Sequence, residues 1–193
     1  MAKIEHIKKS RKDNTCSKCR KIIPKGSAYL KGVINFSPSI IRCESCGLQQ
    51  WEVTTSEYQK EVGEVAFNWR DNFSIDESSV EEIKSTLETI RDNEQDKLDN
   101  LPENLQSSPN AELLQERIDA LDSTIDELDC IDIDGLKADA VSSIIDDEHL
   151  SELDYDVILE KDDVDDDLKE SLQQEYDSNL EEAIDEALNN LNI

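Results

Sequence analysis

Residues 16–46 read CSKCRKIIPKGSAYLKGVINFSPSIIRCESC and contain two Cys-x-x-Cys motifs, separated by 23 residues. A Cys-x-x-Cys turn places two thiolates on one side of a metal ion. Two such turns complete the tetrahedral shell of four ligands that structural zinc prefers. The stretch therefore predicts one zinc site with four thiolate ligands: Cys16, Cys19, Cys43 and Cys46.

Disulfides or a redox-active dithiol are the alternative interpretation of these cysteines. No βαβ pattern, which a redox motif of the thioredoxin type requires, surrounds either pair. A shell of four cysteines leaves no open coordination position, so we expect this zinc to stabilise the fold and not to catalyse a reaction. The fifth cysteine, Cys130, is predicted to be a small buried side chain on a helical face. His6 and His149 lack a second ligand at helical spacing and are predicted to be solvated or packed.

The first 50 residues are expected to form a basic zinc ribbon of short antiparallel strands. Apolar and β-branched residues predict strands at about 22–23, 28–34 and 39–42, and the last of these would deliver Cys43. Residues 1–15 are predicted to be irregular.

Residues 51–75 are expected to form an amphipathic aromatic helix that packs on the ribbon together with Trp51. Thr54 and Glu57 have the spacing of a capping box, in which each residue satisfies a backbone N–H at the helix start. Apolar residues follow at intervals of three and four: Tyr58, Val62, Val65, Ala66, Trp69 and Phe73.

Residues 76–193 are predicted to be an acidic helical region, so the whole chain should be dominated by α-helix. An antiparallel hairpin is expected at about 78–130, because two apolar helical patterns flank a break at 102–109. The second pattern has the spacing of a coiled-coil seam: Leu114, Ile118, Leu121, Ile125 and Leu128. A short helix at 135–147 and a C-terminal helix at about 164–191 should follow. The latter has a broad apolar stripe: Leu168, Leu172, Tyr176, Leu180, Ile184, Leu188 and Leu191.

Charge is distributed unevenly along the chain, whose net charge is -27. Residues 1–42 contain eleven basic residues (Lys and Arg) and two acidic ones. Residues 43–193 contain nine basic residues and forty-five acidic ones. Nucleic acid would be attracted to the first part and repelled by the second. Eight basic side chains could contact phosphates, or could simply solvate an exposed ribbon: Lys8, Lys9, Arg11, Lys12, Lys18, Arg20, Lys21 and Lys25.

No stretch has the length and apolar character of a signal peptide or a membrane span. The sequence therefore predicts a cytoplasmic protein without membrane contact. No glycine-rich phosphate loop and no Ser-His-Asp or Cys-His arrangement is evident, so no catalytic residue is assigned and an enzyme is not expected.

Residues 1–75 resemble the small four-cysteine zinc-finger proteins of tailed bacteriophages, whose function is generally unassigned. The motifs that carry the resemblance are Arg11-Lys12, Cys16-x-x-Cys19, Lys21, Ile23, Lys25-Gly26, Tyr29, Arg42-Cys43-x-x-Cys46 and Thr54-Thr55-Ser56. This chain differs in having Arg20 where those proteins commonly have glycine. It also has an apolar stretch, Val33 to Ile41, where they have a basic one, which weakens the case for nucleic-acid contact there. If the chain is encoded by a phage, the resemblance implies that the protein is located in the cytoplasm of the host cell.

Two functions follow as hypotheses. In the first, the chain is a non-enzymatic accessory protein whose acidic helices bind a partner protein with a basic surface, such as a nucleic-acid-handling enzyme. In the second, residues 1–42 bind nucleic acid, and the acidic region is a solubilising or autoinhibitory tail. Self-association through the seam of residues 114–128 is a further expectation.

Overall fold

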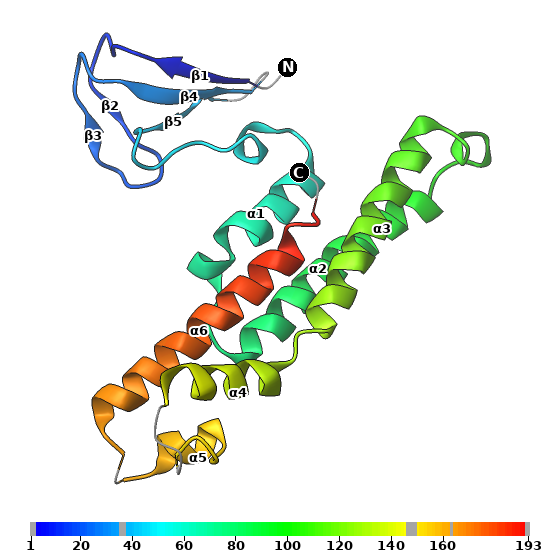
Figure 1. The fold of residues 1–193 in the computed structure, drawn as a ribbon. Coiled ribbons are helices and arrows are strands. Elements are labelled where there is room, and N and C mark those ends of the chain that lie inside the picture. The colour runs from blue at the N-terminus through cyan, green and yellow to red at the C-terminus, as the bar shows by residue number, and fades with distance from the viewer. Residues whose placement is uncertain (1–2, 35–37, 146–149, 163, 192–193) are drawn as a thin grey trace. The chain divides into compact units, whose positions relative to one another are not determined.

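The computed structural model describes residues 3–34, 38–145, 150–162 and 164–191 (Figure 1). The chain forms two compact units, of which the first ends at Glu64 and the second begins at Val65. We call them the N-terminal unit and the helical unit. The elements, in chain order, are β1 (Lys3–Ile7), β2 (Asn14–Thr15), β3 (Ile22–Ile23), β4 (Tyr29–Val33), β5 (Ile40–Arg42), η1 (Trp51–Val53), α1 (Glu57–Asn72), α2 (Glu77–Asp99), η2 (Glu103–Leu105), α3 (Pro109–Asp129), α4 (Ile133–Ile144), α5 (Tyr155–Glu160) and α6 (Asp166–Leu188).

The N-terminal unit contains a three-stranded antiparallel sheet in the order β1-β4-β5 and a two-stranded hairpin of β2 and β3 (Figure 1). The predicted strands at 22–23, 28–34 and 39–42 are present as β3, β4 and β5. The prediction that residues 1–15 are irregular is wrong, since β1 pairs with β4 from Lys3↔Val33 to Ile7↔Tyr29. Only two of the five β1 residues are apolar, so local pattern did not reveal a strand that depends on pairing with distant residues.

The N-terminal unit has a small core, in which Gly63 of α1 permits a close contact with Trp51. A Cβ atom at this position would lie 2.4 Å from the Trp51 side chain, so only glycine lets the indole lie against the helix. The buried apolar residues of this unit are Cys16, Ile23, Leu48, Trp51, Val53, Tyr58 and Val62.

The start of α1 lies two residues later than the proposed capping box. Ser56 precedes the helix, and its Oγ accepts a hydrogen bond of 3.3 Å from the backbone N–H of Gln59. Thr54 Oγ1 instead accepts a hydrogen bond of 3.1 Å from the N–H of Ser56. Thr54 therefore stabilises the segment that precedes the helix and not its first turn. The capping-box prediction for Thr54 and Glu57 is therefore wrong.

Within the helical unit, α2 and α3 form an antiparallel hairpin. Ion pairs that link the first half of one helix with the second half of the other show this direction, since Lys84 pairs with Asp129 at 2.7 Å and Arg117 with Glu94 at 2.9 Å. Ser108 caps α3, with Pro109 in the first turn. The five residues of the α3 seam are all buried within the chain, so self-association through them would require the hairpin to open: Leu114, Ile118, Leu121, Ile125 and Leu128.

The C-terminal helix α6 contributes six buried apolar residues to the core of the helical unit. Leu172, Leu180 and Ile184 are fully buried, as the apolar stripe predicts, and α4 packs against this helix. Trp69, at the end of α1, donates a hydrogen bond of 2.9 Å from Nε1 to Asp185 Oδ1 in α6. The aromatic helix therefore contributes to both units, with Tyr58 in the core of the first and Trp69 in the core of the second.

Candidate metal centre and basic surface

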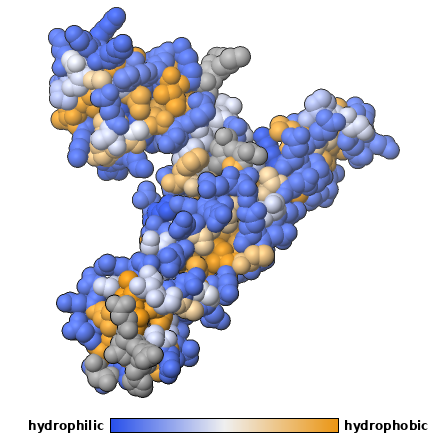
Figure 2. All heavy atoms as spheres, in the orientation of Figure 1, coloured by the Kyte–Doolittle hydropathy of each residue, from blue (hydrophilic) through white to orange (hydrophobic). Residues whose placement is uncertain are grey.

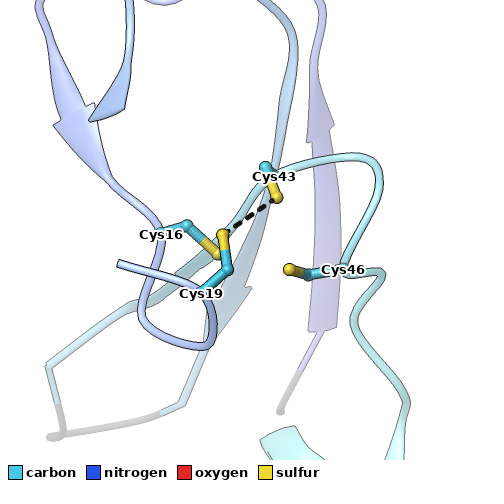
Figure 3. Close-up of side chains that lie close together, drawn as sticks. All are labelled: Cys16, Cys19, Cys43 and Cys46. Carbon is cyan, nitrogen blue, oxygen red and sulfur yellow. Dashed lines mark hydrogen bonds between the residues drawn. The ribbon is translucent and has the colours of Figure 1, made fainter. Parts of the chain in front are cut away.

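Two turns position the four cysteines, and we call residues 16–19 the first knuckle and residues 43–46 the second. The first knuckle follows β2 and closes through two backbone hydrogen bonds of 3.0 Å, from Cys16 N to Lys21 O and from Arg20 N to Cys16 O. The second directly follows β5, and Cys46 N donates to Cys43 O at 3.1 Å. The β-hairpin and the sheet thus bring together two thiol pairs that are distant in sequence (Figure 3).

The four sulfur atoms have the spacing of a metal site. All lie within 4.8 Å of one another, and Cys19 Sγ is 3.7 Å from Cys43 Sγ. A tetrahedral ion with Zn–S bonds of about 2.3 Å would separate its sulfur ligands by about 3.8 Å. All four cysteines are free thiols, and their side chains converge from the two knuckles (Figure 3). The cluster can hold a metal ion such as zinc.

The thiols of Cys16 and Cys46 differ strongly in pKa. Burial favours the neutral thiol of Cys16, but backbone N–H groups of Cys43, Cys19 and Lys18 together outweigh burial and lower its pKa to about 6. Hydrogen bonds to Cys43 and Cys19 raise the pKa of Cys46 to about 12. Four neighbouring thiolates repel one another, so a divalent cation is needed to stabilise all of them at neutral pH.

The backbone is left-handed directly after each knuckle. Gly47 follows Cys46 with φ of 64°, and Arg20 follows Cys19 with φ of 59°. Glycine adopts this region readily, whereas a residue with a Cβ does so at a cost in free energy. Arg20 therefore has a conformation that favours glycine, and the first knuckle forms without one.

An arginine beside the second knuckle ties the two turns together. Arg42 Nη1 donates to Ser17 Oγ in the first knuckle at 2.7 Å, and Arg42 Nη2 pairs with Glu52 of η1. The Glu52 carboxylate also accepts a hydrogen bond of 2.9 Å from Gln49 N. Both partners of the Arg42–Glu52 pair are largely buried, at 15% and 16% exposure. Sequence reasoning gave Arg42 no role, because the pair becomes visible only once the knuckles are assembled.

The eight basic residues proposed for phosphate contact are all exposed, but they do not form one cluster. Four of them lie on the loop between β1 and β2 and line a common pocket of about 630 Å³: Lys8, Lys9, Arg11 and Lys12. The other four lie in the first knuckle, between it and β3, or in the turn after β3, and do not line this pocket: Lys18, Arg20, Lys21 and Lys25.

The remaining candidate side chains are not among the four clustered thiols, although His6 contacts the second knuckle through Glu44. His6 is exposed, and its Nε2 lies 2.9 Å from Glu44 Oε1. The prediction that Cys130 is buried is wrong, because α3 ends at Asp129 and Cys130 follows as an exposed C-cap residue. His149 lies outside the described residues.

Comparison with protein families, with curated proteins and with solved structures finds no match to this chain. Among the described helices, none combines the length and apolar character needed to cross a membrane. The functional argument therefore rests on the chain's own chemistry, which is a cluster of four cysteines able to hold a metal, an adjacent group of exposed cations and a strongly acidic helical unit.

Proposed function

We propose that this chain is a non-enzymatic, phage-type zinc-ribbon accessory protein whose acidic helical unit binds a partner protein through a basic surface. Zinc would hold the N-terminal unit together, and its closed shell of four thiolates leaves no position for a substrate. The observation that carries the proposal is the charge of the helical unit. Residues 65–192 contain forty acidic residues and eight basic ones.

The few cations of the helical unit are largely neutralised within it. Six of them form ion pairs with carboxylates of the same unit: Arg70, Lys84, Arg91, Lys97, Arg117 and Lys137. Hydrophilic residues dominate the visible face around α2 and α3 in Figure 2. A partner therefore meets a surface of excess carboxylates, and opposite charge accelerates association and favours a basic binding face.

The outer face of α3 presents these carboxylates in a regular row. Four exposed acidic residues lie opposite the buried seam: Glu112, Glu116, Asp119 and Asp126. They are three or four positions apart, except that Ser123 interrupts the row between Asp119 and Asp126. Because an α-helix rises 1.5 Å per residue, the row extends for about 21 Å. A regular line of negative charge on a rigid helix is a surface that a phosphate-binding groove of a nucleic-acid-handling enzyme would accept in place of DNA.

Affinity capture from host extract with matched baits tests the proposal. One bait carries Glu112→Gln, Glu116→Gln, Asp119→Asn and Asp126→Asn, and a control bait removes four exposed carboxylates elsewhere, with Glu82→Gln, Asp96→Asn, Glu103→Gln and Glu182→Gln. Both have the same net charge. We expect a basic protein to be retained by wild type and control, lost from the row variant, and displaced by duplex DNA and by salt. Equal retention by all three baits would refute the role of the row.

A second candidate function is nucleic-acid binding by the N-terminal unit, with the acidic unit as a solubilising or autoinhibitory tail. The observation that favours it is the convergence of four cations on one pocket. The two functions use different surfaces, so the row variant of α3 separates them: it should weaken protein capture without weakening nucleic-acid binding.

A further inference from the structure

The pocket between β1 and β2 combines positive charge with an aromatic ring. Lys8, Lys9, Arg11 and Lys12 line it from the loop, and Tyr29 lines it from β4. We call it the basic pocket. Its volume of about 630 Å³ is in the range of sites that enclose small ligands, roughly 300–1,000 Å³.

A buried serine holds the loop of the basic pocket in one conformation. Ser10 is 5% exposed, and its backbone N–H donates to Ser27 O at 2.8 Å. Its carbonyl accepts from Gly26 N at 2.9 Å, and its Oγ accepts from Asn14 Nδ2 at 2.7 Å. The backbone that carries the cations on either side of Ser10 is thereby constrained, which lowers the backbone entropy that would be lost when a ligand binds.

None of the described acidic side chains near the basic pocket pairs with its four cations. Glu44 lies 2.9 Å from His6 Nε2, which also lines the pocket. Glu5 pairs with Lys3 at 2.6 Å, and Asp13 Oδ1 accepts a hydrogen bond of 2.7 Å from the backbone N–H of Lys25. Among the described residues, no ion pair involves the four cations of the pocket. Their charge is therefore available to an anion, in contrast to the paired cations of the helical unit.

We propose that the basic pocket binds a single-stranded nucleic acid, with backbone phosphates on Lys8, Lys9, Arg11 and Lys12 and a base stacked on Tyr29. Four cations in one place favour a polyanion over a single phosphate. A concave site with an aromatic wall favours single strands, because an unstacked base can enter the pocket and lie against the ring. The bases of a duplex are stacked inside the helix and cannot do so.

Fluorescence anisotropy with the full-length, zinc-loaded chain provides the test. The probes are labelled oligonucleotides of about 12 nucleotides, oligo(dT) and oligo(U), and a duplex of the same length, at about 50 mM salt. We expect saturable binding of at least one single-stranded probe, with the duplex bound several-fold more weakly. The DNA and RNA arms identify which single strand is preferred. The logarithm of the binding constant should fall with the logarithm of the salt concentration with a slope of about -3, as expected for four phosphate contacts on a single strand.

Matched charge variants distinguish the pocket from the net charge of the unit. Lys9→Gln with Arg11→Gln removes two cations of the pocket, and Lys21→Gln with Lys25→Gln removes two exposed cations outside it. The pocket pair should weaken binding at least about tenfold and flatten the salt slope by about 1.4, whereas the control pair should change both only slightly. Zinc content and circular dichroism verify that each variant is folded.

Substitution of Tyr29 tests the stacking contact. Tyr29→Phe keeps the aromatic face and should bind like wild type, while Tyr29→Leu should bind at least about fivefold more weakly. Failure of the wild-type chain to bind any single-stranded probe, equal affinity for the duplex, or equal losses in the pocket and control pairs would overturn the proposal. Capture of a basic protein by α3 does not depend on any of these outcomes, so the proposed function stands or falls separately.

Discussion

The residue that follows each knuckle shows how single backbone positions shape the metal centre. Arg20 and Gly47 have nearly the same left-handed φ, but only the glycine adopts it without steric cost. We predict that Arg20→Gly raises the free energy of unfolding of the zinc-loaded protein by about 1 kcal/mol. Thermal denaturation monitored by circular dichroism provides the measurement.

Gly47→Ala is the matched control for this change. No atom lies within 4 Å of a Cβ placed at Gly47, so the substitution tests the backbone alone and should destabilise the protein by about 1 kcal/mol. A neutral or destabilising Arg20→Gly would show that the arginine side chain has a stabilising contact that outweighs the strain.

Thiol ionisation gives a second prediction at this scale. In folded, metal-free protein, Cys16 should ionise at about pH 6 and Cys46 only near pH 12. Because the pKa of Cys16 falls from an ordinary value of 9.0, its contribution to stability is complete above about pH 9 and is lost as pH falls through 6. The raised pKa of Cys46 acts in the opposite direction, since its contribution is complete below pH 9 and is lost as pH rises through 12.

Ultraviolet absorbance of the thiolates during a pH titration measures these steps. The step near pH 6 should disappear in Cys16→Ser and persist in Cys130→Ser. A single transition of all cysteines near pH 9 in protein that remains folded would contradict the assigned hydrogen-bond pattern.

At the scale of elements, the α2–α3 hairpin contains one buried carboxylate. Glu94 is 1% exposed and pairs with Arg117 at 2.9 Å and with Lys97 at 2.5 Å. Removing Arg117 leaves this charge buried with one partner, so Arg117→Leu should destabilise the helical unit by about 1–3 kcal/mol. Urea denaturation followed by far-ultraviolet circular dichroism gives the value.

The double variant Glu94→Leu with Arg117→Leu removes both charges. It should recover at least half of the loss, because an apolar pair avoids the desolvation penalty of an unpartnered carboxylate. A double variant that is as unstable as the sum of the two single variants would show that the residues contribute by packing alone and not as a charge pair.

Elements whose burial follows a local period could be predicted from the sequence. The apolar stripes of α3 and α6 repeat at helical spacing, and residues such as Leu121, Leu180 and Ile184 are buried as that spacing requires. The cysteine cluster was likewise encoded in the spacing of its two motifs. The zinc identity of that site remains a prediction.

Features that depend on long-range pairing could not be predicted. β1 becomes a strand only against β4, which joins Lys3 to Val33. The same pairing brings Tyr29 to the loop after β1 and so creates the basic pocket, and the Arg42–Glu52 pair likewise needs the assembled knuckles. Hydrophobic periodicity contains no information on such contacts, because they are polar or involve residues far apart in the chain.

For the whole molecule, the division into two units gives each its own source of stability. Metal binding contributes about 10–16 kcal/mol to small zinc domains, whereas the helical unit has its own apolar core. We predict that a chelator destabilises the N-terminal unit, which then opens more often, and leaves most of the far-ultraviolet helical signal intact. Limited proteolysis with and without chelator should then show new cleavage between residues 3 and 50 only. Cooperative loss of the entire helical signal would contradict this independence.

The two units also differ in charge. Cations of the helical unit are mostly paired within it, whereas those of the basic pocket are not, so the N-terminal unit has an excess of basic residues and the helical unit an excess of acidic ones. The two proposals follow this division: a basic protein for the acidic row of α3, and a single-stranded nucleic acid for the basic pocket.

The claim that four cysteines bind one structural zinc ion underlies this account. Zinc content per chain, measured by mass spectrometry on wild type, Cys43→Ser and Cys130→Ser, tests it most directly. We predict one zinc ion in wild type and in Cys130→Ser, whose exposed thiol lies outside the cluster, and a strong loss in Cys43→Ser. Wild-type protein purified under reducing conditions without zinc, or Cys43→Ser that retains a full equivalent, would contradict it.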